Sequence, residues 1–340
     1  MSTPRLHRAA RVEDRAHAWL ERWLRRRGWR PRVLAFTGYG DTSQVRVLGR
    51  VLLAPPTTSS AELRLGRGWR RFLTASVAGV EVTVHLDGQR HLLTSDRDGY
   101  LDAVLPANLP PGWAQARLQV AGSSDAVGRL RVVGPNQSLG IVSDIDDTVI
   151  VTALPRPLLA AWNTFVRHEG SRRPVPGMGT LFAEIHRTHG DVPVFYLSTG
   201  AWNVAPTLEQ FLDRHGFPPG PLLLTDWGPT AESWFRSGRE HKRSQLRRLL
   251  AELPVQQWLL LGDDGQHDPE IYTEVATAAP ERIRAVAIRQ LSRSEQVRTH
   301  LTPEPLPDAE PKPTPRHEEV RAPDGFALLA LLRERGLIGG

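Results

Sequence analysis

The spacing of hydrophobic positions changes twice along the chain. Between residues 11 and 29 apolar side chains recur every three or four positions, which predicts an amphipathic helix with arginines on its other face. From residue 33 to about residue 135 apolar and polar positions alternate in short runs, as in half-buried strands. Beyond residue 137 the apolar runs become continuous and alternate with helical periodicity. The pattern predicts a helix, a β domain and an α/β domain, in that order.

The alternating segments predict a small β-sandwich-like antiparallel module over residues 33–136. Strands are expected at 45–53, 80–86, 100–105, 114–120 and 128–133. Asp87 and Gly88 lie between two such runs, where a tight hairpin turn favours residues that accept a positive φ. Several strands at this spacing with no helix between most of them are typical of a sandwich. No cluster of candidate catalytic residues occurs here, which favours a binding or packing role.

The continuous apolar runs predict a parallel sheet over residues 137–300. Its strands are expected at 139–144, 191–198, 220–226, 256–264 and 282–288, and helices around 156–168, 178–189, 204–215, 240–252 and 268–278. Strands that are apolar on both faces need helices on both sides of the sheet. Seven prolines in residues 301–323 indicate a linker, and residues 324–340 predict a short C-terminal helix.

Composition and charge narrow the function classes. The 340 residues include no cysteine, which excludes disulfides and thiolate chemistry. No apolar stretch suits a signal peptide or a transmembrane segment, so we expect a cytoplasmic protein. Residues 1–32 hold ten arginines against three acidic residues, a balance of +7, so the remainder of the +6 chain sums to −1. A nucleic-acid groove through the main body is therefore not expected.

The basic N-terminal helix, within residues 1–32, leaves two interpretations open. In one, its tryptophan-bearing face lies on an anionic lipid surface and gives the protein a peripheral membrane contact. In the other, the same face packs against the following domain.

Polar residues cluster where the predicted parallel strands end. Ligands bind beyond the carboxyl ends of strands in open parallel sheets, so these side chains should converge. In chain order they are Asp144, Asp146 and Thr148 after the first strand, Ser198 at the tip of the second, Lys242 after the third, and Asp263, Asp264 and Asp268 after the fourth. Lys242 is also one of only two lysines among the 43 basic residues, which indicates a specific need for an ammonium group.

This set of side chains fits phosphoryl transfer. Carboxylates from separate strands repel one another unless a cation lies among them, and oxygen ligands without His or Cys favour Mg²⁺. An aspartate can attack a phosphoryl group to form an aspartyl-phosphate. Mg²⁺, Lys242 and Ser198 would then supply positive charge and donors to the phosphoryl oxygens. Asp146, two residues after Asp144, is placed to act as general acid and base.

Three other assignments do not fit the same residues. The segment after Asp144 lacks the glycine and later ligands of an EF-hand. The Walker A pattern of P-loop ATPases is absent from the sequence. In a receiver domain the acidic pair and the nucleophile lie on different strands, and the domain is far shorter than residues 138–300.

The four motifs in this order resemble those of the haloacid dehalogenase superfamily of phosphatases. Over residues 138–300 the segments SDIDDTV, YLSTGAWN, REHK and LLGDDGQHDPEIY are similar to the catalytic domain of the actin-patch-associated phosphatidate phosphatases and their bacterial relatives. The resemblance implies a haloacid dehalogenase-like Rossmannoid sheet and a phospholipid substrate. The expected reaction is Mg²⁺-dependent hydrolysis of phosphatidate to diacylglycerol and phosphate through an aspartyl-phosphate.

Two alternatives stay open beside that activity. One is a phosphatase of the same superfamily that acts on a soluble phosphomonoester or a phosphoprotein. The other is a recruitment factor in which the N-terminal module is the main functional part.

The resemblance gives each motif residue a role by position. Asp144 would be the nucleophile and a metal ligand, and Asp146 the acid and base, with its carbonyl also on the metal. Thr148, Ser198 and Lys242 would surround the phosphoryl group, with Thr148 steadying the first motif. Asp263 would complete the metal site, and either Asp264 or Asp268 would be its second acid.

The second motif departs in part from the family pattern. The family has Ser-Asn-Ser-Pro-Trp-Asn where this chain has Ser198-Thr-Gly-Ala-Trp202-Asn203. The retained Ser, Trp and Asn support phosphate binding and place Trp202 and Asn203 at the substrate mouth, whereas the contacts directly after Ser198 stay open. The short spacing from Asp144 to Ser198 and from there to Lys242 leaves no room for a large cap domain. An open site that accepts a bulky phosphomonoester is therefore expected.

Overall fold

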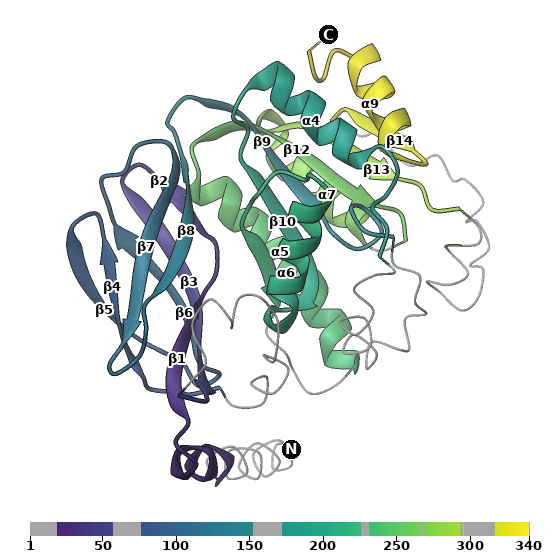
Figure 1. Cartoon of the computed structure of the whole chain (residues 1–340). Helices are drawn as coiled ribbons and strands as arrows, with labels where there is room; N and C mark the ends of the chain where they lie inside the picture. Colours follow the sequence, from purple (N-terminus) through teal and green to yellow (C-terminus); the bar gives the residue numbers. More distant parts are fainter. Residues whose placement is uncertain are drawn as a thin grey trace, which may run out of the picture. The chain divides into compact units, whose positions relative to one another are not determined.

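The computed structural model describes residues 19–56, 76–151, 172–225, 231–265, 267–292, 295 and 317–339. The chain divides into an N-terminal unit, Met1–Val132, and a C-terminal unit, Val133–Gly340 (Figure 1). The change in hydrophobic spacing along the sequence predicts this boundary between residues 136 and 137. No helix in the described ranges is long and apolar enough to cross a membrane.

The N-terminal unit contains one eight-stranded sheet in the order β1-β3-β2-β8-β7-β4-β5, with β6 paired to β3. Antiparallel pairings join β1, β2 and β6 to β3, β4 to β5 and β7, and β7 to β8. The strands are β1 Arg30–Ala35, β2 Gly38–Asp41, β3 Gln44–Ala54, β4 Glu81–Leu86, β5 Gln89–Thr94, β6 Tyr100–Pro106, β7 Gly112–Val120 and β8 Ala126–Val133. The five strands expected from the alternating pattern are present, β5 is the second strand of the hairpin expected at Asp87 and Gly88, and β1 and β2 were not predicted.

The turn between β4 and β5 forms where the sequence predicts it. Asp87 has a φ of 48° and Gly88 a φ of 70°, the left-handed conformation that a two-residue hairpin turn requires. The turn sets the register in which Leu86 pairs with Gln89 and His85 pairs with Arg90.

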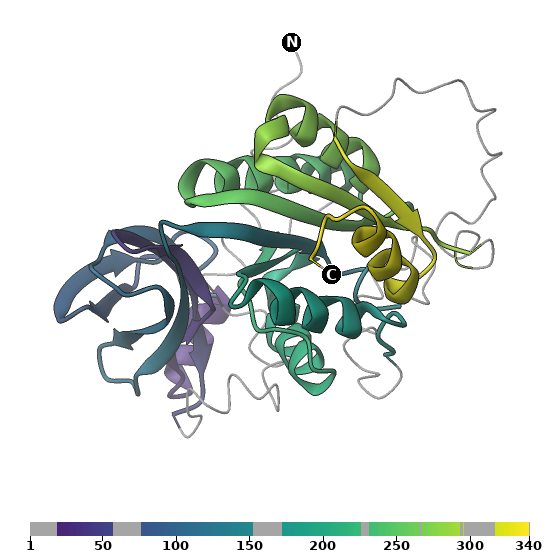
Figure 2. The same cartoon turned by 90° about the horizontal axis from the view of Figure 1, so that it is seen from above.

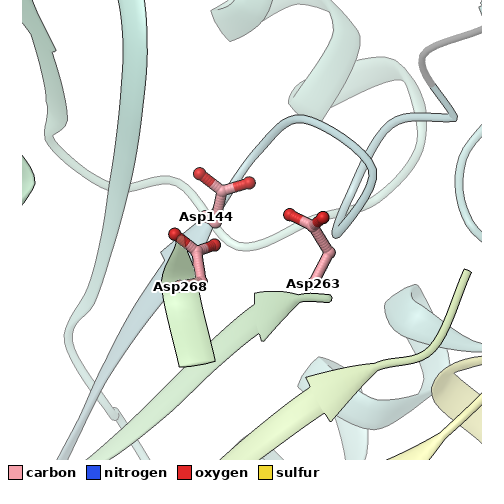
Figure 3. A group of neighbouring side chains, drawn as sticks. All are labelled: Asp144, Asp263 and Asp268. Carbon is pink, nitrogen blue, oxygen red and sulfur yellow. The ribbon is translucent and has the colours of Figure 1, made fainter. Parts of the chain in front are cut away.

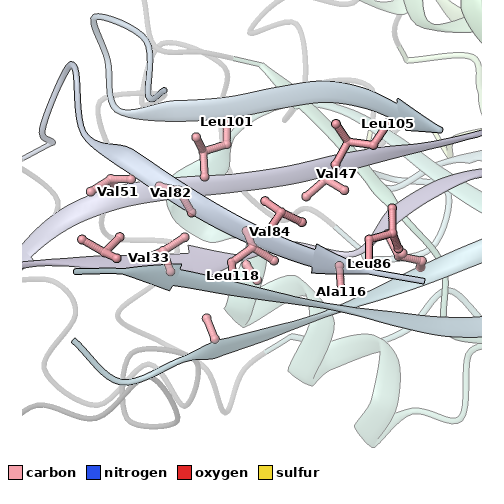
Figure 4. Close-up of a cluster of buried hydrophobic side chains, with 14 of the residues drawn as sticks. Val33, Val47, Val51, Val82, Val84, Leu86, Leu101, Leu105, Ala116 and Leu118 are labelled. Atoms are coloured by element: carbon pink, nitrogen blue, oxygen red, sulfur yellow. The ribbon is translucent and has the colours of Figure 1, made fainter. Parts of the chain in front are cut away.

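A single hydrophobic core holds this sheet together (Figure 4). Alternate residues of each strand point inward, such as Val82 and Val84 of β4 and Ala116 and Leu118 of β7. Strands from both ends of the sheet order contribute to the same cluster, so the sheet curls around its own inner face. The expected sandwich-like module is thus built as one continuous curled sheet.

The leucines and the tryptophans of the N-terminal helix lie in different surroundings. Residues 19–26 are helical, and Leu20 and Leu24 pack against the core of the N-terminal unit. Trp19 and Trp23 remain 61% and 37% exposed and stack on each other with their ring centroids 6.3 Å apart. The leucines therefore dock the helix, and the tryptophans are left on its outer side.

The C-terminal unit is an α/β domain with a six-stranded parallel sheet in the order β11-β10-β9-β12-β13-β14. The strands are β9 Gln137–Asp144, β10 Val194–Ala201, β11 Leu222–Thr225, β12 Val255–Asp263, β13 Ile283–Arg289 and β14 Glu319–Ala322. The helices are α4 Met178–His189, α5 Ala205–Arg214, α6 Ala231–Glu252, α7 Asp268–Ala278 and α9 Gly325–Glu334, with short 3₁₀ turns η4 Trp202–Val204 and η5 Pro280–Arg282.

Helices cover both faces of the parallel sheet, as its continuous apolar strands require. Helices α6 and α7 pack together on one face, and α4 and α9 on the other (Figure 2). On the α4 side, Phe182 packs against Tyr196 of β10 and against Phe217. The central strand β9 is fully buried from Leu139 to Asp144.

A glycine allows the closest contact between the two middle strands. An added Cβ at Gly140 of β9 would lie 2.8 Å from the ring of Trp258 on β12, closer than side chains normally approach. Trp258 is itself completely buried and meets Phe195 of β10 edge to face.

Two sequence expectations for this unit need revision, and two fall outside the described residues. Helix α6 begins at Ala231 rather than near residue 240, so Lys242 lies within the helix and not at its start. Residues Glu319–Ala322, which their proline-rich surroundings placed in a linker, form the edge strand β14. The helix expected around 156–168 and the linker through residue 316 lie outside the described ranges.

The C-terminal segment is an integral part of this unit. Strand β14 pairs in parallel with β13, and Asp324 caps α9 by accepting a hydrogen bond from the backbone N–H of Ala327. The N–H of Gly325 donates to the carbonyl of Pro176, which precedes α4. Leu328 and Leu332 of α9 are buried where the helix meets α4.

Replacing Leu332 by Ala should therefore destabilise the C-terminal unit. Leu332 is completely buried, so the change removes packing contacts and leaves a cavity, and we expect a loss of about 2–5 kcal/mol in the free energy of unfolding. Urea denaturation measures it. The control is Glu334→Ala, an exposed position on the same helix, with an expected change below about 0.5 kcal/mol. Equal effects of the two variants would mean that α9 is not docked.

Candidate active site

The candidate site forms at the carboxyl edge of the parallel sheet, where its strand order reverses. Strands β9, β10 and β11 follow one another in one direction, and the chain then crosses to β12 on the other side of β9. Such a switch point leaves a crevice beyond the strand ends. Asp144 ends β9 and Asp263 ends β12, while Ser198 follows Leu197, the partner of Asp144 on β10.

Three aspartates face one another at this edge. One carboxylate oxygen each from Asp144, Asp263 and Asp268 lie within 4.8 Å of one another. Their side chains point toward a common centre from the ends of β9 and β12 and the start of α7 (Figure 3). All three are buried, with exposures of 1%, 0% and 0%. We call this group the aspartate trio.

Lys242 lies beside the aspartate trio and pairs with two of its members. Its Nζ atom is 2.6 Å from Oδ1 of Asp144 and 2.5 Å from Oδ1 of Asp268, and the side chain is buried. The ammonium carries one positive charge, which cannot balance three carboxylates. The Oδ2 atoms of all three aspartates are buried and have no hydrogen-bond partner in the described part of the chain. These free oxygens could hold a cation.

Burial and mutual repulsion dominate the electrostatics of this group. Burial raises the pKa of Asp144 well above its ordinary value, against the opposing effect of Lys242, and Asp268 and Asp263 raise it further. The pKa of Asp263 is raised by burial and by Asp268. Burial alone would lower the pKa of Lys242, but Asp144, Asp268 and Asp263 raise it above its ordinary value. Lys242 therefore remains an ammonium, and the trio needs either protons or another cation.

Asp146 and Ser198 meet beside the aspartate trio. The hydroxyl of Ser198 donates to Oδ2 of Asp146 over 3.0 Å and accepts from the backbone N–H of Gly200 over 3.0 Å. This bond joins the first and second sequence motifs and fixes the direction of the Asp146 carboxylate. Thr148 is buried, and its hydroxyl has no partner among the residues described.

The two aspartates that follow Asp263 point to different places. Asp264 accepts a hydrogen bond from the backbone N–H of Leu291 over 2.8 Å, and its own N–H donates to the carbonyl of Arg289. Its carboxylate is thus directed at the segment after β13 and does not belong to the aspartate trio. Asp268 does belong to it. Of the two acids that the sequence left as alternatives, the structure places Asp268 in the aspartate trio and Asp264 outside it.

Residues 139–290 match the family described as "Phosphatidate phosphatase APP1, catalytic domain". The matched region, which is similar to that family, makes up less than half of the 340-residue chain. Phosphatidate phosphatase APP1 of Saccharomyces cerevisiae is 29% identical over 157 residues, which are 46% of this chain and 26% of the yeast protein. An uncharacterized protein of Schizosaccharomyces pombe is 30% identical over 162 residues, 45% of this chain and 25% of that protein. The chain thus spans about a quarter of the length of these curated relatives.

Solved structures give only weak superpositions. A carbohydrate acetylesterase of Xanthomonas citri covers 76% of this chain and 68% of its own chain, at 14% identity and a TM-score of 0.29. PhoD covers 75% of this chain and 70% of its own, at 9% identity and a TM-score of 0.33. These values assign no fold, so the haloacid dehalogenase-like assignment stays a prediction.

The APP1-type region contains every motif residue from Asp144 to Asp268. Trp202 and Asn203, predicted at the substrate mouth, lie half-buried in η4 directly after β10. The Asn203 Oδ1 atom is buried and has no hydrogen-bond partner among the described residues.

His241 precedes Lys242 and does not take part in the aspartate trio. Its Nε2 atom lies 3.3 Å from the carbonyl oxygen of Leu223. Burial lowers the pKa of His241 to about 4, so the ring is neutral at neutral pH.

Arg289 is a site residue that sequence reasoning missed. It ends β13 in register with Asp263 on β12, and it is 5% exposed. The signal was an arginine at the buried carboxyl end of a largely apolar strand, in register with Asp263 at the end of the neighbouring strand. Of its partners, Asp147 lies 142 positions away in the chain and Pro323 lies 34 positions away, whereas Glu295 is six positions away.

Replacing Lys242 by Met should destabilise the C-terminal unit in a pH-dependent way. With divalent ions chelated, the uncompensated trio should lower the free energy of unfolding by about 3–5 kcal/mol at pH 8. The loss should shrink toward pH 5, because carboxyl groups whose folded-state pKa is raised bind protons there and relieve the repulsion.

The matched control is Arg243→Met, the next residue on α6, which pairs with Glu274 at the surface. We expect less than about 1 kcal/mol for this change. Urea denaturation at the two pH values measures both variants. Equal, pH-independent losses would contradict the assigned role of Lys242.

Proposed function

We propose that the C-terminal unit is an Mg²⁺-dependent phosphatase that hydrolyses phosphatidate to diacylglycerol and phosphate. The observation that carries this proposal is the buried aspartate trio with unpaired oxygens beside Lys242. It lies in the region that matches the catalytic domain of a family described as phosphatidate phosphatase. The family match supports the substrate class, and the charges at the site support the reaction type.

The donor set of the site suits a hard divalent cation. The carboxylates of Asp144, Asp263 and Asp268 converge, each has one oxygen without a hydrogen bond among the described residues, and no histidine belongs to the group. Oxygen ligands of this kind favour Mg²⁺ over zinc or copper. When bound, Mg²⁺ would supply positive charge to the phosphoryl group.

The chain's own residues account for both chemical steps. In the first, a carboxylate oxygen of Asp144 attacks phosphorus, the bond from phosphorus to the glycerol oxygen breaks, and Asp146 donates its proton to the leaving oxygen. In the second, Asp146 takes a proton from water as the water oxygen attacks the aspartyl-phosphate, which releases phosphate and restores Asp144. Lys242 supports the negative phosphoryl oxygens throughout, and Ser198 orients Asp146.

Phosphate release from phosphatidate in mixed micelles tests this proposal. Activity should require added Mg²⁺ and disappear with a chelator. Asp144→Asn, which removes the nucleophile, should lower kcat by roughly 10³-fold or more. The matched control is Asp264→Asn, since its side-chain oxygen can still accept from Leu291 and lies outside the trio. Its kcat should stay within about tenfold of wild type. Full activity of Asp144→Asn would refute the mechanism.

The same assay distinguishes the alternative substrates. Glycerol 3-phosphate, p-nitrophenyl phosphate and a phosphoserine peptide present the same reacting group without acyl chains. A kcat/KM higher on one of these than on phosphatidate would favour a phosphatase for soluble phosphomonoesters or phosphoproteins.

A peripheral membrane contact through the N-terminal helix is part of this proposal. Trp19 and Trp23 are stacked and exposed, and the guanidinium of Arg27 lies 3.7 Å from the ring centroid of Trp23. Tryptophan beside arginine suits the boundary between lipid headgroups and acyl chains, and arginine is attracted to anionic lipid. A lipid substrate requires this kind of access to a membrane surface.

The double change Trp19→Ala and Trp23→Ala should weaken flotation with phosphatidylcholine vesicles that contain phosphatidate. Each tryptophan would bury apolar surface in the bilayer, so the bound-to-free ratio should fall by at least about tenfold. Leu92→Ala, at a 63% exposed position on β5, is the control and should bind as wild type does. Unchanged binding of the double variant would exclude this helix as the contact.

A further inference from the structure

Arg289 joins three separate segments of the C-terminal unit at the edge of the candidate site. Its Nη1 donates to the carbonyl of Asp147 over 2.8 Å, and its Nε donates to the carbonyl of Pro323 over 3.1 Å. Its Nη2 is 2.6 Å from Oε1 of Glu295. A buried guanidinium must have such partners, because an unpaired charge in the interior is strongly unfavourable.

The first of these partners belongs to the turn that follows the predicted nucleophile. Asp147 has a φ of 59°, an uncommon conformation for a residue with a side chain. Inside the turn its N–H donates to the carbonyl of Ile150, and the N–H groups of Val149 and Ile150 both donate to Ile145. The carbonyl of Asp147 faces outward from the turn to Arg289. Arg289 therefore holds the turn from outside, next to Asp146.

The other two partners lie beyond the region that matches the APP1-type family, which ends at residue 290. Pro323 connects β14 to α9, and the N–H of Gln290 donates to the carbonyl of Ala322 on β14. Glu295 is held by Ser292, whose N–H and hydroxyl both donate to its Oε2 atom. Arg289 thus receives its orientation from parts of this chain outside the matched domain.

We infer that Arg289 is a positioning residue that fixes the Asp146–Asp147 turn, and that the C-terminal segment from Glu319 to Glu334 contributes to the site through the Pro323 carbonyl. Among the described residues, the hydrogen bonds of Arg289 go to Asp147, Pro323 and Glu295 and not to the aspartate trio, so it acts through the backbone of Asp147. The activity part of this inference rests on the proposed phosphatase function, whereas the conformational part does not.

The same strand supplies a matched control. Arg284 of β13 also ties the C-terminal segment to the sheet, with its Nε donating to the carbonyl of Leu337 over 2.9 Å and its Nη2 to Gly336 over 3.2 Å. It lies near the amino end of β13, opposite the carboxyl edge that carries the site. Arg284→Ala therefore removes a comparable anchor without touching the turn.

Hydrogen exchange of the full-length protein tests the conformational part. In Arg289→Ala, a peptide that spans residues 145–151 should exchange its amides at least tenfold faster than in wild type, because the turn loses its outer hydrogen bond. In Arg284→Ala the same peptide should exchange at the wild-type rate. Equal exchange of this peptide in both variants would overturn the inference.

Steady-state kinetics on phosphatidate test the activity part. Arg289→Ala should lower kcat by about 10–100-fold with KM changed less than about threefold, since the turn positions reacting groups rather than the lipid. Added guanidinium should restore part of the lost kcat, and Arg289→Lys should retain more activity than Arg289→Ala. A kcat for Arg289→Ala equal to that of Arg284→Ala would refute the positioning role.

The exchange and activity measurements together distinguish a failure of the phosphatase proposal from a failure of the positioning role of Arg289. If wild type releases no phosphate while the exchange difference is found, the phosphatase proposal fails and the positioning of the turn stands. If Arg289→Ala does not fold, Arg289→Gln, which keeps much of the side chain but loses the charge and cannot bond all three partners, decides through the same exchange measurement. The turn peptide should exchange faster in Arg289→Gln than in Arg284→Ala, and exchange at the wild-type rate would overturn the inference.

Discussion

The structure depends on the burial of three carboxylates around one ammonium group. Asp144, Asp263 and Asp268 are drawn together from two strand ends and a helix start, and Lys242 offsets only part of their repulsion. Bringing such charges out of water is unfavourable unless partners compensate for it. The parallel sheet keeps them together, because its packed strands fix the positions of the backbone from which these side chains project. An arrangement this unfavourable in isolation is typical of a site that receives a charged ligand.

Much of this frame was predictable from residue patterns. The helix at 178–189 and the helix at 268–278 have the bounds expected from the sequence, because each has a clear apolar face between polar or glycine-containing ends. The polar strand ends were also readable, since a buried apolar strand followed by several aspartates is unusual. That the side chains of Asp144, Asp263 and Lys242 converge followed from the parallel topology.

Other features could not be read in the same way. The four-residue strand β14 is short, lies at the sheet edge and follows a proline-rich stretch, so local propensity gave no indication of it. The contact between Arg289 and Asp147 joins residues 142 positions apart, which only the folded chain brings together. The separation of Asp264 from Asp268 had a usable signal that was overlooked. Successive side chains of a strand point to opposite sides, so the side chain of Asp264 is expected to point away from that of Asp263.

The contact between Gly140 and Trp258 links the packing of the sheet to the strand that carries Asp144. Backbone hydrogen bonds set the spacing of β9 and β12, and the missing side chain at Gly140 leaves room for the indole over β9, four residues before Asp144. A larger residue at position 140 would have to displace the buried ring of Trp258 or the strand itself. The strand that ends in Asp144 therefore keeps its place in the sheet only while one position in its interior stays without a side chain.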